Sequence, residues 1–91
     1  MVRVDYLEGQ IREVEGFDVA IQWPDGSNVR GDFERARSYR YERAARDSWT
    51  VAEWIRERFH HRNPQFDVSV LDNSGNPVSG RHTLGTVRET Y

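Results

Sequence analysis

Apolar residues alternate with polar or small ones over residues 17–23 and again over residues 66–70. Each stretch runs into a segment rich in Asp, Asn, Ser, Gly and Pro, the residues that form tight turns. Alternation with a period of two is typical of a strand with one buried face, so we predict a strand and a turn in both places. The inward-facing side chains would be those of Phe17, Val19, Ile21, Trp23, Phe66, Val68 and Val70.

The two predicted hairpins resemble each other in sequence. Residues 17–31 align without a gap on residues 66–80, and Phe, Asp, Val, Gly, Val and Gly coincide. The match predicts two hairpins of one design: an inward Phe-x-Val-x-aliphatic face, a turn that needs glycine, and a Val-x-Gly segment where the chain bends away. Turn residues also recur for steric reasons alone, so internal duplication and chance similarity both stay open.

A helix start signal lies between the hairpins. Thr50 is the predicted N-cap, and Glu53, three residues on, completes a capping box. Trp49 and Trp54 occupy the two positions of a hydrophobic staple, which fixes the angle at which the chain enters the helix. We predict one main helix over about residues 51–61, followed by an Asn-Pro pair that ends it.

Arg58 interrupts the apolar stripe of this helix, near its centre, where a core-facing helix should be apolar. In one interpretation, the last turn overhangs the sheet and the Arg58 head reaches water along an apolar surface. In the other, the helix end meets a partner and Arg58 and Trp54 act as anchors. The stripe consists of Val51, Trp54, Ile55 and Phe59.

Four further segments complete the expected fold. Alternation over residues 2–7 predicts a first strand, whereas residues 11–14 are too few to separate a strand from a helical turn. Residues 32–46 mix helix formers with tyrosines, and a helix there would turn two arginines toward the core, so we predict a loop and then a strand from about Ser38 to Ala45. Residues 84–90 predict a last strand.

These elements predict a single α+β domain with a mixed sheet of about four to six strands packed on one main helix. The order of a strand over Tyr39–Ala45, a helix starting at Thr50 and a strand from Phe66 resembles the ubiquitin-like β-grasp. The resemblance implies that residues 17–91 form the core and residues 1–16 an N-terminal strand or hairpin extension. Modifiers and sulfur carriers of that fold end in Gly-Gly, whereas this chain ends in Arg-Glu-Thr-Tyr, so the resemblance does not carry their conjugation role.

Composition removes several functional classes. The 91 residues suffice for one modest core, and the absence of cysteine excludes disulfides, thiolate metal sites and cysteine nucleophiles. The chain shows no charged-then-apolar leader and no run near the ~18 apolar residues of a membrane span, so we expect a cytoplasmic protein without a membrane partner.

Basic residues concentrate in the middle of a chain whose formal net charge is −2. On a strand, the residues at odd positions from 35 to 43 would share one face, with guanidinium and aromatic groups at ~7 Å intervals. Such a face could stack bases and contact phosphates, or bind a protein, or its tyrosines could simply pack on the helix. The candidate binding residues are Arg35, Arg37, Tyr39, Tyr41, Arg43 and Arg58.

No constellation of residues predicts catalysis. The chain contains no nucleophile elbow, phosphate-binding glycine loop or dinucleotide fingerprint. Asp18 and Asp67 take matching places in the hairpins but should point outward. The adjacent His60 and His61 would point about 100° apart on a helix and rarely share an ion, and His82 lies far along the chain. We therefore predict no catalytic residue, cofactor, metal or small-molecule ligand.

Three functions compete on this basis. The first is a small non-catalytic interaction module that binds a protein partner or self-associates, through a sheet edge or the Arg/Tyr surface. The second is nucleic-acid binding through the strand at residues 35–43. The third is an enzyme of unknown reaction.

Overall fold

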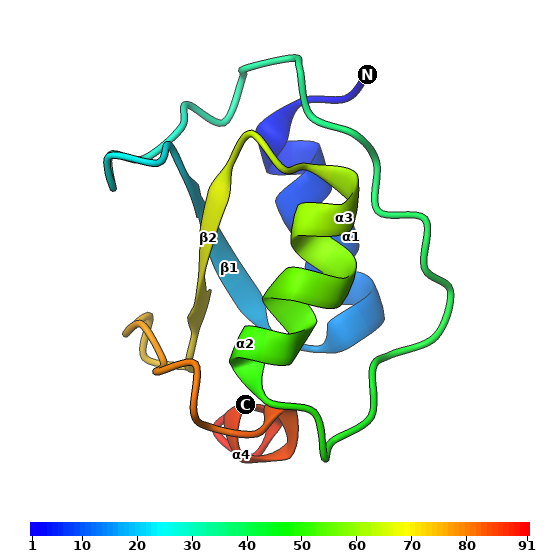
Figure 1. The fold of residues 1–91 in the computed structure, drawn as a ribbon, viewed down its shortest axis with the longest axis vertical. Coiled ribbons are helices and arrows are strands. Elements are labelled where there is room, and N and C mark those ends of the chain that lie inside the picture. Colours follow the sequence, from blue (N-terminus) through cyan, green and yellow to red (C-terminus); the bar gives the residue numbers. More distant parts are fainter.

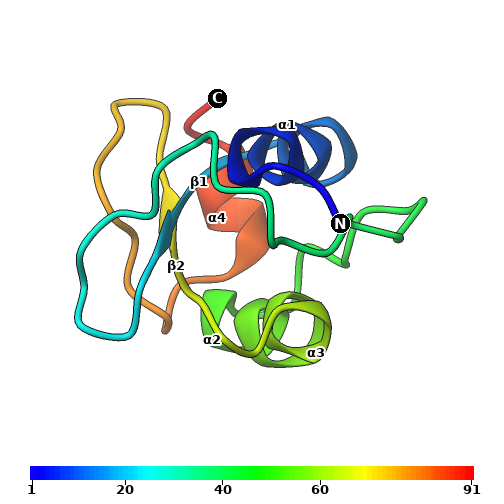
Figure 2. The same cartoon turned by 90° about the horizontal axis from the view of Figure 1, so that it is seen from above.

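The computed structural model describes residues 1–91 and has a two-stranded antiparallel sheet with both long helices on one of its sides (Figures 1 and 2). The second long helix spans residues 51–62 and consists of three consecutive segments, the middle one being a π-helix. In chain order the elements are α1 (Val4–Glu15), β1 (Asp18–Gln22), α2 (Val51–Trp54), η1 (Ile55–Phe59), α3 (His60–Arg62), β2 (Asp67–Leu71) and α4 (Leu84–Arg88).

The strands β1 and β2 confirm the two stretches of alternating residues. They pair antiparallel with Ala20 opposite Ser69, so the pairing is symmetric about the midpoints of the two strands. In both strands the second and fourth residues are buried and the others are half-buried or exposed, which is the pattern of a sheet covered on one face. The aromatic rings of Phe17 and Phe66, just before the strands, are fully buried, and the Phe17 ring meets Trp54 edge-on at 5.2 Å between centroids.

The predicted capping box is also confirmed. The Thr50 hydroxyl accepts a hydrogen bond from the Glu53 N–H at 3.1 Å, and the Glu53 carboxylate accepts one from the Thr50 N–H at 3.1 Å. The helix that starts there buries Val51, Trp54 and Phe59 in the hydrophobic core that it shares with the strands.

The two hairpins have the same design. In residues 23–27 the first N–H donates to the last carbonyl at 2.8 Å, and the matching bond in residues 72–76 is 2.9 Å. Gly26 and Gly75 occupy equivalent turn positions with φ of 90° and 82°, a backbone conformation that L side chains rarely adopt. The similarity of the two sequence stretches therefore corresponds to a repeat in three dimensions.

The repeat extends to the helices. The Asp5 N–H, in the first turn of α1, donates to the Gly31 carbonyl at 2.9 Å, and the Ala52 N–H, in the first turn of α2, donates to the Gly80 carbonyl at 3.1 Å. Each hairpin thus returns to the start of the helix that precedes it. We call residues 4–31 the first unit and residues 51–80 the second unit; each is a helix, a strand and a hairpin, and the two pair through β1 and β2.

One extra residue distinguishes the helix of the second unit. Three buried apolar residues of α1 are spaced by three and then four positions, whereas their counterparts in the second helix are spaced by three and then five. A π-helical turn accommodates such an insertion, which is where η1 lies. The residues compared are Val4, Leu7 and Ile11 in α1 and Val51, Trp54 and Phe59 in the second helix.

The predicted fold class is wrong. The sheet has two strands instead of four to six, and the chain has two long helices instead of one main helix. The β-grasp resemblance depended on strands that the chain does not have, because residues 38–45 form no strand and residues 84–90 contain α4. Outside the region of that resemblance, the strand predicted over residues 2–7 is also absent, since α1 begins at Val4.

Two physical causes explain why helices form where strands were predicted over residues 2–7 and 84–90. Apolar residues at the helical spacing, including Leu7 and Ile11, bury one face of α1 and leave Tyr6 57% exposed. At the other end, the Thr83 hydroxyl accepts from the Thr86 N–H and caps α4 as a helix.

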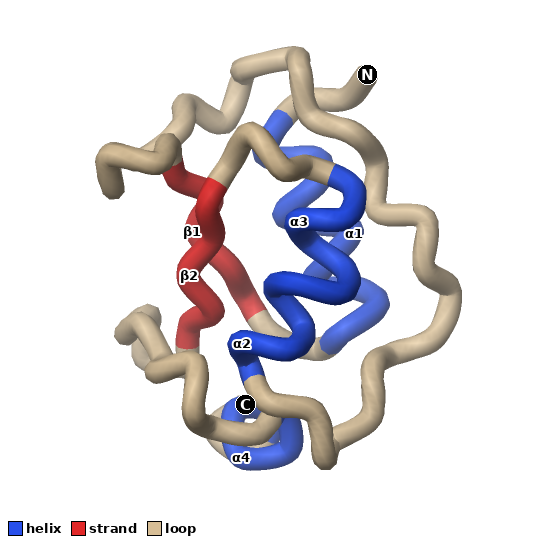
Figure 3. Tube along the Cα trace, in the orientation of Figure 1, coloured by secondary structure: helices blue, strands red, loops and turns tan.

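Residues 34–46, which we call the strap, lead from the first unit toward the second without forming a helix or a strand (Figure 3). In Figure 1 the strap descends along the side of the molecule that carries α1 and α3, away from the sheet. Only Ala36 makes a bridge of backbone hydrogen bonds to a distant residue, Val2.

Candidate interaction surface on the strap

The buried residues of the strap are spaced by multiples of three, with Glu42 as the one exposed position on the same spacing. Ala36, Tyr39 and Ala45 are buried, with exposed fractions of 0%, 5% and 4%. A repeat of three residues is the period of the extended polyproline II conformation, whereas a strand would repeat every two. The strand predicted over Ser38–Ala45 therefore has the wrong period, and side chains assigned to one face point to opposite sides.

One end of the strap is held by Asn63, the residue that follows α3. The Asn63 Oδ1 accepts from the Arg37 N–H at 2.7 Å, and the Asn63 Nδ2 donates to the Arg37 carbonyl at 3.1 Å. Next to it, the Gln10 Oε1 accepts from the Tyr39 N–H at 3.0 Å. Side chains thus replace the backbone partners that a sheet would supply.

The other end is held by Glu15, the last residue of α1, whose side chain is 0% exposed. Its Oε1 accepts from the Ala45 N–H at 2.9 Å and from Arg88 at 2.8 Å. Its Oε2 accepts from Arg58 at 2.7 Å and from the Tyr39 hydroxyl. A buried carboxylate is tolerated when it is paired and hydrogen-bonded, and Glu15 meets both conditions.

The phenol of Tyr39 is part of this network. It donates to Glu15 and accepts from the Trp54 Nε1–H at 3.0 Å. Burial raises the pKa of Tyr39 far above its ordinary value, and the Glu15 carboxylate raises it further. Tyr39 therefore stays a neutral donor, and its ring cannot be reached by an external ligand.

Arg58 joins the same network. Its side chain is 15% exposed, its guanidinium pairs with Glu15, and it also donates to the Arg43 carbonyl at 2.6 Å. The guanidinium lies over the Tyr41 ring at 4.4 Å from the centroid. The head of Arg58 is thus held by the protein instead of reaching water, because the extra residue in η1 turns it toward α1 and the strap.

The arginines of the strap itself point away from the core. All five are exposed, and none makes an ion pair or a side-chain hydrogen bond with the rest of the protein. Two exposed glutamates, Glu34 and Glu42, accompany them, which leaves an excess of three positive charges (five minus two) on the strap. The five are Arg35, Arg37, Arg40, Arg43 and Arg46.

The candidate binding residues predicted from the sequence fall into an exposed group and a buried or covered group. Arg35, Arg37 and Arg43 are exposed, while Tyr39 is buried and Tyr41 is half-buried beneath Arg58. Sequence reasoning missed two members of the exposed row because it used a period of two. A period of three would have found the row, which runs Arg37, Arg40, Arg43, Arg46.

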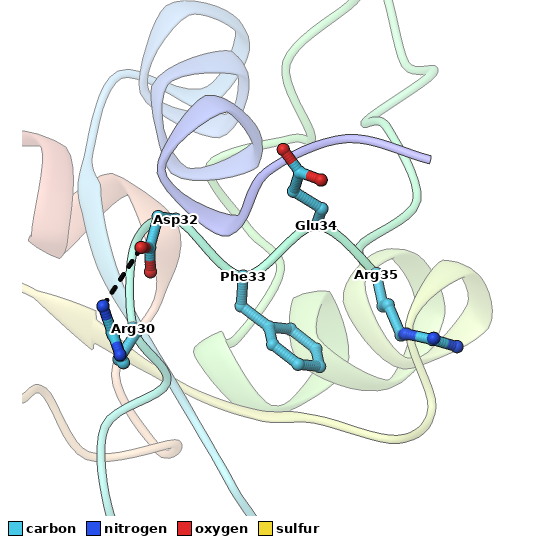
Figure 4. Close-up of a pocket in the computed structure, with 5 residues that line it drawn as sticks. All are labelled: Arg30, Asp32, Phe33, Glu34 and Arg35. Atoms are coloured by element: carbon cyan, nitrogen blue, oxygen red, sulfur yellow. Dashed lines mark hydrogen bonds and ion pairs between the residues drawn. The ribbon is translucent and has the colours of Figure 1, made fainter.

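An open hollow of about 350 Å³ lies where the chain enters the strap (Figure 4). Arg30 pairs with Asp32 at 3.1 Å beside it. In Figure 4, Phe33 and Arg35 point to one side of the chain and Glu34 to the other, with the Arg35 guanidinium turned away from the Phe33 ring. The charged groups do not converge on a common point.

No group of three or more potential metal-ligand side chains converges anywhere in the structure. The two aspartates at matching hairpin positions contact side chains at matching helix positions instead. Asp18 lies 3.0 Å from Arg12 in an ion pair, and Asp67 lies 3.3 Å from the His60 imidazole, which is charged only when it is protonated. Both pairs are exposed and connect a helix to the strand that follows it.

No helix of the structure is both long and apolar enough to cross a bilayer. No family model, curated protein or solved structure matches the chain.

Proposed function

We propose that the protein is a small non-catalytic module that binds an acidic segment of a protein partner through the strap. One observation carries the proposal: five exposed arginines on one continuous segment have no partner within the protein. Arginine presents a planar fork of donors that matches carboxylates, and it is enriched where protein surfaces bind one another. A cytoplasmic location stays a prediction, as does self-association.

Nucleic acid is the second candidate, favoured by the same arginines. One feature weighs against it. The Tyr39 ring is buried and the Tyr41 ring is covered by Arg58, so neither supports base stacking.

Titration with poly-L-glutamate tests the proposal directly. We expect binding at low salt that weakens as salt rises, because exposed charge contacts are screened. The triple variant Arg37→Gln, Arg40→Gln, Arg43→Gln should bind about tenfold more weakly, since three screened contacts of ~0.5 kcal/mol add to that factor. Isothermal titration calorimetry or fluorescence anisotropy would measure the affinity.

A matched control removes three exposed arginines elsewhere. Arg30→Gln, Arg56→Gln, Arg81→Gln has the same net charge as the strap variant but leaves the strap intact. Equal loss of affinity in both triple variants would show that only net charge matters and would contradict the proposal. Single-stranded DNA that binds more tightly than poly-L-glutamate at equal charge would favour the second candidate.

A further inference from the structure

Two residues at equivalent places in the repeat hold the strap. Glu15 and Asn63 are the only buried polar or charged residues of the chain. Each comes four positions after a buried apolar residue of its helix, Ile11 in one unit and Phe59 in the other. The two units therefore place one polar side chain at the C-terminal end of each helix.

Both side chains bind the strap backbone, at opposite ends of the arginine row. Asn63 satisfies both backbone groups of Arg37, and Glu15 accepts from the N–H of Ala45. Arg40 and Arg43 lie between these two points and are exposed. Asn63 and Glu15 thus hold the two ends of this stretch, and between them Gln10 accepts from the Tyr39 N–H and Arg58 donates to the Arg43 carbonyl.

We propose that Asn63 and Glu15 are positioning residues that clamp the strap in one conformation and thereby set its affinity for an acidic segment. The affinity part of the inference rests on the proposed function. Ordering a free backbone opposes binding by ~1 kcal/mol or more per residue, and a strap that is already ordered avoids that loss. Asn63 and Glu15 contact the strap backbone and leave the guanidinium groups of the arginines free. A preorganised charged surface needs both an ordered backbone and unpaired charges.

Asn63→Ala tests the clamp. It removes both hydrogen bonds to Arg37, so we expect amide hydrogen exchange to accelerate by about tenfold or more at Arg37, the factor that follows from a lost buried partner, and to accelerate also at Tyr39, the next strap amide with an acceptor. Exchange in β1 and β2 should change less. Affinity for poly-L-glutamate should fall, while the slope of log affinity against log salt stays unchanged because every arginine is still present.

Two further variants keep the test decisive. Gln10→Ala removes only the acceptor for the Tyr39 N–H and should give a smaller effect of the same sign if Asn63→Ala does not fold. Val70→Ala truncates a fully buried core residue of β2, away from the attachments of the strap, and it should leave strap exchange and affinity unchanged in the folded fraction.

Each outcome decides a different part of the inference. Unchanged strap exchange in a folded Asn63→Ala would overturn the clamp. Faster strap exchange with unchanged affinity would overturn the positioning role. If the wild-type chain does not bind poly-L-glutamate, the proposed function fails together with the role in affinity, and the exchange measurement still decides whether Asn63 holds the strap.

Discussion

Glu15 is a fully buried carboxylate with donors on both oxygens. Arg58 and Arg88 supply the charge, and the Ala45 N–H and the Tyr39 hydroxyl fill the remaining acceptor positions. No buried side-chain nitrogen or oxygen in the protein lacks a partner. Burying such a group is costly only when it loses its partners, so the network should be sensitive to the loss of any one member.

Replacement of Arg58 by methionine tests this sensitivity. Arg58→Met leaves part of the Glu15 charge unpaired, and we expect the free energy of unfolding to fall by about 3 kcal/mol, as for a broken buried ion pair. Urea denaturation followed by circular dichroism would measure it. Arg56→Met is the control, because Arg56 is exposed and pairs only with its neighbour Glu57, and it should change stability by no more than ~0.5 kcal/mol. Similar losses in the two variants would argue against a stabilising role for the network.

The elements of the chain differ in how far local residues determine them. In α1, Gly9 lies in the helix interior with open space where a Cβ would lie, whereas Gly16 ends the helix with a φ of 82°. The same residue type therefore has opposite effects at the two places. Interior glycine weakens a helix, and terminal glycine permits the left-handed cap.

Alanine substitutions at the two glycines should shift stability in opposite directions. Gly9→Ala should raise the free energy of unfolding by about 0.5–1 kcal/mol, because alanine has the higher helix propensity and nothing blocks its methyl group. Gly16→Ala should lower it by about 1 kcal/mol, because the left-handed conformation is strained for alanine. Thermal and urea denaturation would measure both. A loss of stability in Gly9→Ala would mean that α1 is not a regular helix at that point.

Signals that lie close together in the sequence predicted their elements correctly. The capping box of Thr50 and Glu53 and the two Phe-x-Val strands need only neighbouring residues to be read. In α1, the alternation over residues 2–7 concealed the helical spacing of Leu7 and Ile11.

The candidate site was predictable only in part. Arg35, Arg37 and Arg43 were nominated and are exposed, but the directions of Tyr39 and Arg58 depend on Glu15, which lies far away in sequence. No local pattern shows that contact. The period of the strap is likewise set by its attachments to α1 and to Asn63, outside the strap itself.

At the scale of the whole molecule, the two units share one sheet and one hydrophobic core, and the strap and α4 are tied to both. Arg88 of α4 illustrates the connection, because it donates to Glu15 in the first unit and to Asp47 beside the second. Neither unit has a core of its own that could be closed without the other.

We therefore expect the chain to unfold in a single cooperative transition. Urea curves recorded by far-ultraviolet circular dichroism, which reports the helices of both units, and by tryptophan fluorescence should coincide. Trp23 belongs to the first unit and Trp54 to the second, so separate unfolding would split the fluorescence curve. Two resolved midpoints would contradict the shared core.

The strap also has a consequence for how the two units can vary. A covalent connection of this length keeps the units at an effective concentration on the order of millimolar, so their pairing does not depend on the amount of protein. Separate copies of one unit would have to match each other to associate, whereas joined units are free to differ. Here the first helix ends in Glu15 whereas the second is followed by Asn63, and only the second contains the extra residue of η1, next to Arg58. Covalent linkage thus turns a symmetric pairing into an asymmetric protein with a single strap surface.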